Sequence, residues 1–514
     1  MTILHVTLPD GTDVEATDDI SRVQAPVTIK GYLLCSLAAF GGIFFGYDSG
    51  YVNGIMGMPY FISLYTGLNP ATTPPTEFGL PAWEKSLIVA ILSAGTFFGS
   101  IIAGDSADFF GRRTTILGGC AVFAVGVALQ TASTGIGLFA AGRVVAGLGI
   151  GSVTAIVVLY VSEICPEKIR GAVVSVYGLF ICIGLLVAAC VDYGTQHNTN
   201  SSSYRIPVAI QFVWAIILSA GLVLLPESPR YFVRKGRPEK AAAALARLRS
   251  QPQDSEQVHF ELAEIIANHQ YELQLNPHTT YIASWTNCLR GGLRNPSSNL
   301  RRTLMGTSML AFQQWGGANF IFYSSTTFFQ QLGTIQNPFL MGIILTLVNV
   351  CSTPIAFWTY EHWGRRPVLL YGAAGMATCQ YLVAIVGSTV SPDNKVAVRA
   401  EIALICIYIF IFAPTWGPRP WIVAGEIFPL HIRARGIGIS AASNWFWNCI
   451  IGVITPYLLG PQYGNLGTKV FTIWGSACVL AFLFVYFLVP ETKGISLEQI
   501  DKLLEEVSPR KSSK

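Results

Sequence analysis

The stretch PVAIQFVWAIILSAGLVLL, residues 207–225, contains nineteen residues and no charged side chain. A helix needs about 20 mostly apolar residues to cross a bilayer, so this stretch predicts a membrane span. The whole 514-residue chain agrees, because 52% of its residues are hydrophobic and only 12% are charged. Soluble domains have about 25% charged residues. The chain is therefore predicted to be a membrane protein, and its net charge of +4 does not indicate a nucleic-acid partner.

Windows of the same length and hydropathy recur along the chain, and they predict an all-α protein with twelve transmembrane helices. The windows lie near 31–52, 86–104, 114–133, 136–160, 171–191, 207–225, 303–325, 338–359, 367–389, 401–425, 434–459 and 468–489. The stretch 226–302, between the sixth and seventh windows, is polar and contains a helical run from Pro238 to Ser250. We expect it to form short helices on the cytosolic face.

The positive charges predict the orientation, because Lys and Arg concentrate in cytosolic loops. Most of the 33 Lys and Arg residues fall in the tails and in the loops after spans two, four, six, eight and ten. The opposite loops hold Lys85, Arg205, Lys395, Arg399 and Lys469. Both termini are therefore predicted to be cytosolic. Asn200 begins an Asn-Ser-Ser glycosylation sequon between spans five and six, on the predicted outer side.

Two charged signatures occur once in each half of the chain. Asp108-Phe-Phe-Gly-Arg-Arg113 follows span two and Glu361-His-Trp-Gly-Arg-Arg366 follows span eight. Glu163-Ile-Cys-Pro-Glu-Lys-Ile-Arg170 follows span four, and Glu426-Ile-Phe-Pro-Leu-His-Ile-Arg433 follows span ten. Repeats of this kind are typical of carriers that rock two bundles around a central site. The predicted organisation is a cytosolic tail (1–30), a six-helix bundle (31–225), a cytosolic linker (226–302), a second six-helix bundle (303–489) and a cytosolic tail (490–514).

In combination, seven further motifs resemble those of the sugar porters of the major facilitator superfamily, and most closely those of fungal hexose transporters. They are GGIFFGYD at 41–48, GRVVAGLGIG at 142–151, PESPR at 226–230, QQWGGAN at 313–319, GPRPW at 417–421, SNW at 443–445 and PETKG at 490–494. The resemblance extends from Gly41 to Glu498. It implies the major facilitator fold and transport by alternating access.

The resemblance implies a cytosolic gate, in which acids and arginines at helix ends pair and separate as the bundles move. Its expected members are Asp108, Arg112, Glu163, Arg170, Glu227, Arg230, Glu361, Arg365, Glu426 and Arg433. Positive charge at the cytosolic face could explain the arginines alone. It does not explain why an acid recurs at a fixed spacing from them, so the gate is the favoured interpretation.

Asp48 and Arg143 lie inside predicted spans. Charges within the membrane are costly and usually mark an ion or substrate path. By resemblance to proton-coupled sugar porters, Asp48 accepts the proton and Arg143 tunes it. A permanent structural ion pair is the alternative. Facilitators that resemble this chain also keep the Asp, so facilitated diffusion stays open.

The resemblance also implies a sugar site, because amides can donate to and accept from hydroxyl groups and indoles stack on the apolar face of a sugar. Its expected residues are Gln313, Gln314, Asn319, Asn349, Trp421, Asn444 and Trp445. For a single amide, the alternative is a hydrogen bond that holds two helices together.

Three positions depart from the family pattern and could tune the substrate. Gly178 stands where span five usually carries a Gln, Tyr323 is followed by Ser324 rather than by a second Tyr, and Arg419 lies between the prolines of GPRPW. A guanidinium could bind a carboxylate. It could also cap carbonyls that Pro418 and Pro420 free in span ten.

These observations predict a multi-pass cell-membrane transporter that imports a glucose-like monosaccharide with a proton and functions as a monomer. The alternatives are a facilitative uniporter, a carrier of a sugar acid or specialised metabolite, and a sugar sensor that does not transport. No nucleotide loop, metal cluster or catalytic triad is apparent, so neither an enzyme nor a cofactor is expected. The 11 Cys residues are scattered without metal-ligand or disulfide spacing.

Overall fold

The computed structural model describes residues 4–7, 13–16, 36–37, 39–74, 78–165, 167–275, 281–292, 298–332, 337–390, 394–429, 432–460 and 462–493. The described residues are helical apart from a short antiparallel hairpin, in which β1 (Leu4–Thr7) pairs with β2 (Asp13–Ala16). The prediction of an all-α membrane fold is therefore confirmed for the described part of the chain, with this hairpin as an addition in the N-terminal tail.

The N-terminal half forms one helical bundle. Its elements are α2 (Gly41–Ile55), α3 (Pro59–Thr66), α4 (Ala82–Phe110), α5 (Arg112–Ala132), α6 (Ile136–Ile164), α7 (Glu167–Thr195) and α8 (Ser202–Leu224). α4 packs on α6 and α2 packs on α7 through glycines that allow the backbones to approach closely. A Cβ on Gly147 would stand 2.4 Å from the carbonyl oxygen of Leu92, and one on Gly46 would stand 2.0 Å from that of Ile181.

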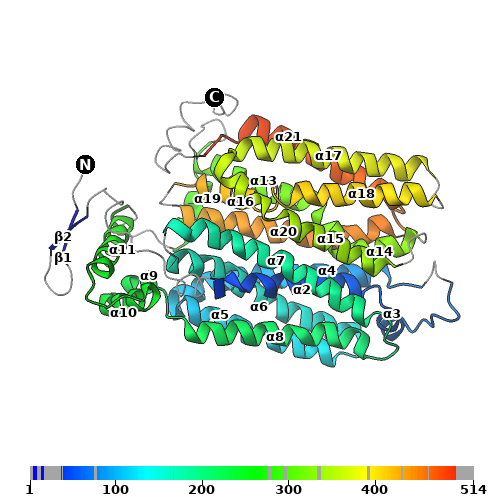
Figure 1. The fold of residues 1–514 in the computed structure, drawn as a ribbon, viewed down its shortest axis with the longest axis horizontal. Helices are drawn as coiled ribbons and strands as arrows, with labels where there is room; N and C mark the ends of the chain where they lie inside the picture. Colours follow the sequence, from blue (N-terminus) through cyan, green and yellow to red (C-terminus); the bar gives the residue numbers. More distant parts are fainter. Residues whose placement is uncertain are drawn as a thin grey trace.

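The linker between the halves forms short helices at one end of the bundles, which we call the linker end. They are α9 (Pro229–Arg234), α10 (Pro238–Arg249), α11 (Glu256–Leu275), α12 (Tyr281–Thr286) and the 3-10 turn η1 (Asn287–Leu289). α9, α10 and α11 share a small apolar core of their own. Figure 1 shows these three helices at the left end of the long bundle axis.

The C-terminal half repeats the helical bundle. Its elements are α13 (Asn299–Trp315), α14 (Ala318–Leu332), α15 (Pro338–Ser352), α16 (Ile355–His362), α17 (Arg365–Thr389), α18 (Lys395–Phe412), α19 (Arg419–Glu426), α20 (Arg433–Leu459), η2 (Gly467–Lys469) and α21 (Val470–Leu488). The two halves have separate hydrophobic cores. In Figure 1 the two bundles lie one above the other, with their helices along the same direction.

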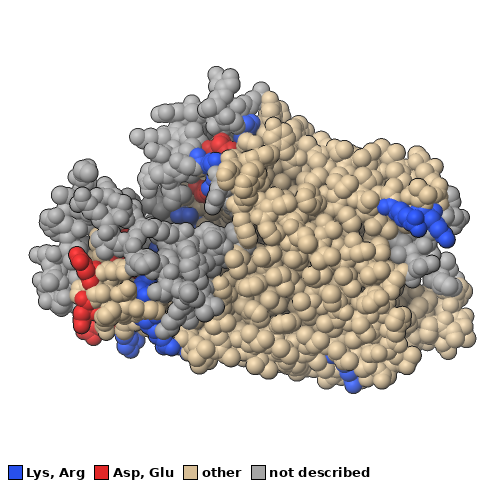
Figure 2. Space-filling view, in the orientation of Figure 1, with Lys and Arg blue, Asp and Glu red and all other residues tan. Residues whose placement is uncertain are grey.

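Nine helices in the described residues are long and apolar enough to cross a membrane. They correspond to nine of the twelve predicted windows. The windows 303–325 and 401–425 each contain a break, between α13 and α14 and between α18 and α19, and α2 is described only from Gly41. The apolar helices leave most of the molecular surface without charge. Figure 2 shows a wide uncharged band on the visible face, between the charged linker end and a few cations towards the opposite end.

A candidate transport site between the two halves

The break between α13 and α14 occurs at Gly316 and Gly317. Gly317 has φ +91, a left-handed conformation that favours glycine. The carbonyl of Gly316, left without a helical partner, accepts hydrogen bonds from Gln380 Nε2 and from the Tyr408 hydroxyl, each at 2.7 Å. The break therefore interrupts the helix inside the bundle, and the amides of the QQWGGAN motif lie on both sides of it.

Gln313 joins this break to the one in the neighbouring segment. Its Nε2 donates to the carbonyl of Trp416 at 2.9 Å and to that of Gly417, where the chain turns between α18 and α19. Its Oε1 accepts a hydrogen bond from Asn444 Nδ2 on α20 at 3.0 Å. Gln313 and Asn444 are 8% and 4% exposed. One amide thus satisfies two freed carbonyls and connects three segments of the C-terminal half.

Gln314 is the centre of a second set of amides that reaches the other half. Its Oε1 accepts from Asn319 Nδ2 and, at 3.1 Å, from Asn448 Nδ2. Ser93 on α4 donates to Asn448 Oδ1 at 2.6 Å. Neither Ser93 nor Asn448 was predicted as a site residue. For Asn448 a signal existed, because it lies four residues after Asn444 and therefore on the same face of its helix.

The remaining residues expected at the sugar site have different environments. Asn349 on α15 is 4% exposed, and Trp445 on α20 packs edge-on against Phe45 of the N-terminal half, with ring centroids 5.5 Å apart. Trp421 on α19 is 40% exposed. A Cβ placed on Gly178 would meet no atom within 4 Å, so open space adjoins the position where the family carries a Gln.

Arg419 is 1% exposed, and its Nη1 donates to the carbonyl of Gly364 at 3.1 Å. Arg419 was predicted either to bind a carboxylate or to cap carbonyls freed in span ten. It caps a carbonyl, but this carbonyl belongs to the loop before α17. Tyr323 lies on α14 one turn after Asn319, and the two residues line a pocket together with Ser324 between the halves.

Asp48 and Arg143 form a fully buried ion pair in the N-terminal half. Arg143 Nη1 lies 3.2 Å from Asp48 Oδ1, and the two residues are 1% and 0% exposed. The same nitrogen donates to the Tyr51 hydroxyl at 3.0 Å, and Arg143 Nε donates to the carbonyl of Ile88 at 3.3 Å. A buried pair is stable only when its other polar atoms are satisfied, and these two neutral partners meet that need for the guanidinium.

At the linker end of the N-terminal half, the predicted gate residues form one charged cluster. Arg112 Nε lies 3.0 Å from Glu163 Oε2, and Arg112 Nη1 lies 3.3 Å from Asp108 Oδ1. Glu227 accepts hydrogen bonds from the backbone N–H groups of Arg112 and Arg113, at 2.9 and 3.1 Å, and so caps the start of α5. Glu163 also accepts from Ser228 Oγ.

The C-terminal half repeats this cluster. Arg365 Nη2 lies 3.0 Å from Glu426 Oε1, and Thr492 Oγ1 donates to Glu426 Oε2 at 2.6 Å. Glu491 accepts from the backbone N–H groups of Arg365 and Arg366, at 2.8 and 3.1 Å, as the cap of α17. Glu491 was not predicted as a gate residue from the sequence. The Pro-Glu pair that PESPR and PETKG share could have indicated it.

The structure does not assign the other four predicted gate residues to either cluster. The side chains of Arg170 and Glu361 lie outside the described residues. Arg230 is exposed, and Arg433 Nε donates to the carbonyl of Gly425 at 3.0 Å. The gate ion pairs that involve described side chains join helices of the same half, which fits a linker end where the halves are apart.

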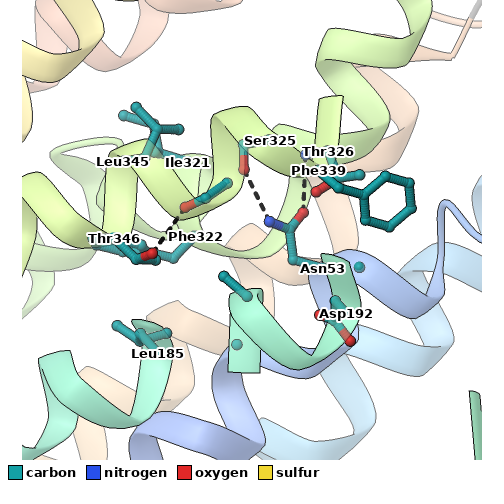
Figure 3. Close-up of a pocket in the computed structure, with 14 residues that line it drawn as sticks. Asn53, Leu185, Asp192, Ile321, Phe322, Ser325, Thr326, Phe339, Leu345 and Thr346 are labelled. Atoms are coloured by element: carbon teal, nitrogen blue, oxygen red, sulfur yellow. Dashed lines mark hydrogen bonds between the residues drawn. The ribbon is translucent and has the colours of Figure 1, made fainter. Parts of the chain in front are cut away.

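The halves meet at the end opposite the linker. Asn53 Nδ2 on α2 donates to Ser325 Oγ on α14 at 2.9 Å, and Asn53 Oδ1 accepts from the backbone of Thr326 at 3.1 Å. Gln330 donates to the carbonyl of Gly57 at 3.0 Å. We call these contacts the opposite-end clasp, and Figure 3 shows its Asn53 bonds as dashed lines.

The caps on α5 and α17 predict a measurable contribution to stability. Replacing Glu491 with Ala removes a carboxylate that accepts two backbone N–H groups, so we expect a loss of about 1–2 kcal/mol in the free energy of unfolding. Thermal unfolding of the purified protein in detergent should show a lower midpoint for this variant. The unfolding midpoint of Glu491→Gln should lie between those of the parent and of Glu491→Ala. An unchanged midpoint for both variants would refute the capping role.

Two helical bundles with broken helices, buried amides and an internal ion pair are features of membrane transporters. The structure is similar to the solved inward-open conformation of the xylose transporter XylE from E. coli, with a TM-score of 0.72, 23% identity, and coverage of 92% of this chain and 99% of that chain. At this identity the likeness shows the fold alone.

The chain belongs to the family described as "Sugar (and other) transporter", whose profile matches residues 34–504. It is 43% identical to the major facilitator-type transporter ecdD of Aspergillus rugulosus, over 94% of this chain and 88% of that protein. It is 41% identical to the probable glucose transporter rco-3 of Neurospora crassa, over 95% of this chain and 81% of that protein. It is also 40% identical to the high glucose sensor RGT2 of Saccharomyces cerevisiae, over 95% and 63%. The predicted sugar-porter membership is confirmed.

Proposed function

We propose that the protein imports a hexose across the plasma membrane together with a proton, as a monomer that works by alternating access. The observation that carries this proposal is the buried Asp48–Arg143 pair, at 3.2 Å inside the N-terminal bundle. A purely structural pair would use the same neutral partners but would stay ionised throughout the transport cycle. A coupling role requires an acid that can be neutralised and a guanidinium that has other partners when this happens, and Arg143 has them in Tyr51 and Ile88.

Protonation of Asp48 would remove the charge that holds Arg143. The guanidinium would then be held only by neutral oxygens, and α2 would be less tightly tied to α6. Tyr323 lies within electrostatic reach of Asp48 and of Arg143, and it lines a pocket with Asn319. Tyr323 therefore offers a route by which the charge state in the N-terminal half can affect the amides of the C-terminal half.

The amide network around Gln313 and Gln314 is the proposed sugar site. In the structure the amides bond to one another and to freed carbonyls. A hexose would exchange these internal bonds for bonds to its hydroxyl groups, which amides can both donate to and accept from. Trp445, held edge-on against Phe45 of the other half, provides an apolar surface nearby.

The proposed orientation places the linker end in the cytosol. Charged clusters and the arginine-rich linker lie there, as the positive-inside rule requires. Asn200 lies in an exposed turn at the opposite end, where it would be glycosylated outside the cell. The opposite-end clasp is then an extracellular gate that is closed in this structure, and the protein faces inward.

Uptake of radiolabelled sugars by a yeast without its own hexose carriers tests this function. We expect glucose to be accumulated and a protonophore to abolish the accumulation. Competition by a hexuronate or by a disaccharide instead of neutral hexoses would favour a sugar-acid or larger-metabolite carrier. Glucose binding without any uptake would identify a sensor.

The open space beside Gly178 favours one alternative, a substrate larger than a hexose. If the substrate is a hexose, Gly178→Gln should add one hydrogen bond to it and lower KM for glucose about three- to tenfold. Gly178→Leu is the matched control, because it fills the same space without an amide and should not lower KM. Loss of uptake in both variants, with normal surface expression, would show that a side chain at this position obstructs the transport path.

A further inference from the structure

Asp192 is a second buried acid, and it lies apart from the Asp48–Arg143 pair. It is in the last turn of α7, is 3% exposed, and its Oδ1 has no hydrogen-bond partner. None of the ion pairs between described side chains includes it. A buried carboxylate without a cation is costly when ionised and is normally neutralised. The closed gate therefore favours the protonated form of Asp192.

The carboxyl group lines a small cavity of about 20 Å³ between the two halves. α2 and α7 of the N-terminal half form one side of it, and α14 and α15 of the C-terminal half form the other. Its polar lining includes Asn53, Ser325, Thr326 and Thr346. Figure 3 shows Asn53 between Asp192 on one half and Ser325 and Thr326 on the other. The pocket thus contains the acid and the main polar contact of the gate together.

Asp192 contacts the gate helix at Gly54, the residue after Asn53. A Cβ on Gly54 would stand 2.2 Å from Asp192 Oδ2, so the carboxyl group packs directly on the backbone of α2. Hydration and ionisation of Asp192 would displace this packing. Because Asn53 is the adjacent residue, such a displacement would also strain its bonds to Ser325 and Thr326.

The ionisable groups on the helices that neighbour α7 have partners or carry no charge at neutral pH. On the helices that pack against α7 and on α14, the ionisable side chains in the half towards the gate are Tyr47, Asp48, Tyr51, Arg143, Tyr204, Arg205 and Tyr323. Arg143 is paired with Asp48, and Arg205 Nε donates to the Tyr204 hydroxyl at 3.3 Å. α15 carries no acidic or basic residue in its described length.

We propose that Asp192 is a proton-binding site of the extracellular gate, protonated when the gate is closed and ionised when it opens to water. The proposal rests on the orientation given under the proposed function. Its proton enters from outside and returns there when the gate reopens, so it sets the gate equilibrium and is not the transported proton of Asp48. External acid should therefore close the gate and external alkali should open it.

Labelling of a thiol inside the pocket tests the proposal without any need for sugar transport. Thr346→Cys places the thiol in the pocket, where Thr346 is 7% exposed. A membrane-impermeant maleimide is added to intact cells at external pH 5 and pH 8, and modification of the introduced thiol is measured by mass spectrometry. The quantity compared is the labelling rate of Thr346→Cys divided by that of the double variant Thr346→Cys, Asp192→Asn at the same pH. The effect of pH on the reactivity of the thiol is the same in both proteins and cancels in this ratio.

We expect a ratio near 1 at pH 5 that rises about fivefold or more at pH 8, because only the carboxylate can ionise and open the gate. Asp192→Ser is a second neutral variant in case Asp192→Asn does not reach the surface. Glu84→Gln is the matched control, since Glu84 is also a buried acid, 6% exposed, but does not line the pocket. It should leave the ratio unchanged.

Three results would overturn the proposal. One is a ratio that is the same at both pH values. Another is a ratio that does not depend on pH but changes when choline replaces external Na⁺, because the ligand of Asp192 would then be a metal cation. The third is a pH dependence that Asp48→Asn removes and Asp192→Asn does not, which would leave proton coupling intact and exclude Asp192.

Discussion

Replacing Asp48 with Asn is expected to abolish accumulation of sugar against its gradient while leaving entry down the gradient measurable. Asn cannot bind and release a proton, so the variant would resemble a carrier that is permanently protonated. Arg143 would keep its bonds to Tyr51 and to the carbonyl of Ile88, which should allow the N-terminal bundle to fold. The expected phenotype is therefore loss of coupling rather than loss of the protein.

The size of this effect follows from the energy of one proton. A membrane potential of 100 mV supplies about 2.3 kcal/mol per proton, enough for a gradient of roughly 50-fold. The ratio of internal to external concentration of a non-metabolised glucose analogue should fall from well above 1 in the parent to about 1 in Asp48→Asn. Asp254→Asn, an exposed acid in the linker, should accumulate sugar like the parent. Parent-level accumulation by Asp48→Asn would exclude Asp48 as the proton site.

Replacing Gln313 with Ala should cause the largest loss of sugar affinity among single changes in the C-terminal half. Gln313 holds the carbonyls of Trp416 and Gly417 and accepts a hydrogen bond from Asn444. Its loss would leave the two carbonyls without this donor and Asn444 without its acceptor. In the proposed site the Gln313 amide exchanges these bonds for bonds to sugar hydroxyl groups, and loss of two or three such bonds of about 1 kcal/mol each corresponds to a rise in KM of roughly 30- to 150-fold.

The control for this variant is Gln196→Ala, which removes a buried amide at the opposite end, outside the network. It should leave KM for glucose unchanged. Thermal unfolding of each variant separates the two roles that an amide can have. If Gln313→Ala lowers the unfolding midpoint but keeps the parent KM, the amide only holds helices together and the sugar site lies elsewhere.

The sequence predicted the bundles well because hydropathy and charge act locally. Residues 207–225 carry no charge and form most of α8, and the predicted linker contains α9, α10 and α11. The breaks were less visible, since a hydropathy window averages over the glycines at 316 and 317. The left-handed backbone of Gly317 divides span seven into α13 and α14 without changing its composition.

Side chains that pair across the bundle could be predicted only where a repeat or a resemblance indicated them. Arg112 and Glu163 were expected in one gate because the family resemblance implies it, and Arg112 Nε lies 3.0 Å from Glu163 Oε2. Glu491 belongs to an equally clear repeat, PESPR and PETKG, which was recognised only as a family motif. The pairing of Ser93 with Asn448 joins helices far apart in the sequence, and no local pattern indicates it.

Asp192 illustrates what the sequence cannot show. It stands at the end of a predicted span, where an acid usually faces water. Its burial depends on Gly54 of α2 and on the closing of the C-terminal half over it, both of which are tertiary effects. The same dependence makes Asp192 sensitive to the state of the gate.

The internal pH of proteoliposomes during sugar entry tests the central claim most directly. The purified protein is reconstituted with a pH-sensitive dye inside the vesicles, and glucose is added outside at equal pH on both sides. Proton coupling predicts acidification of the lumen that begins with glucose entry and is absent in Asp48→Asn. Entry of radiolabelled glucose without any acidification in the parent protein would contradict the proposed coupling.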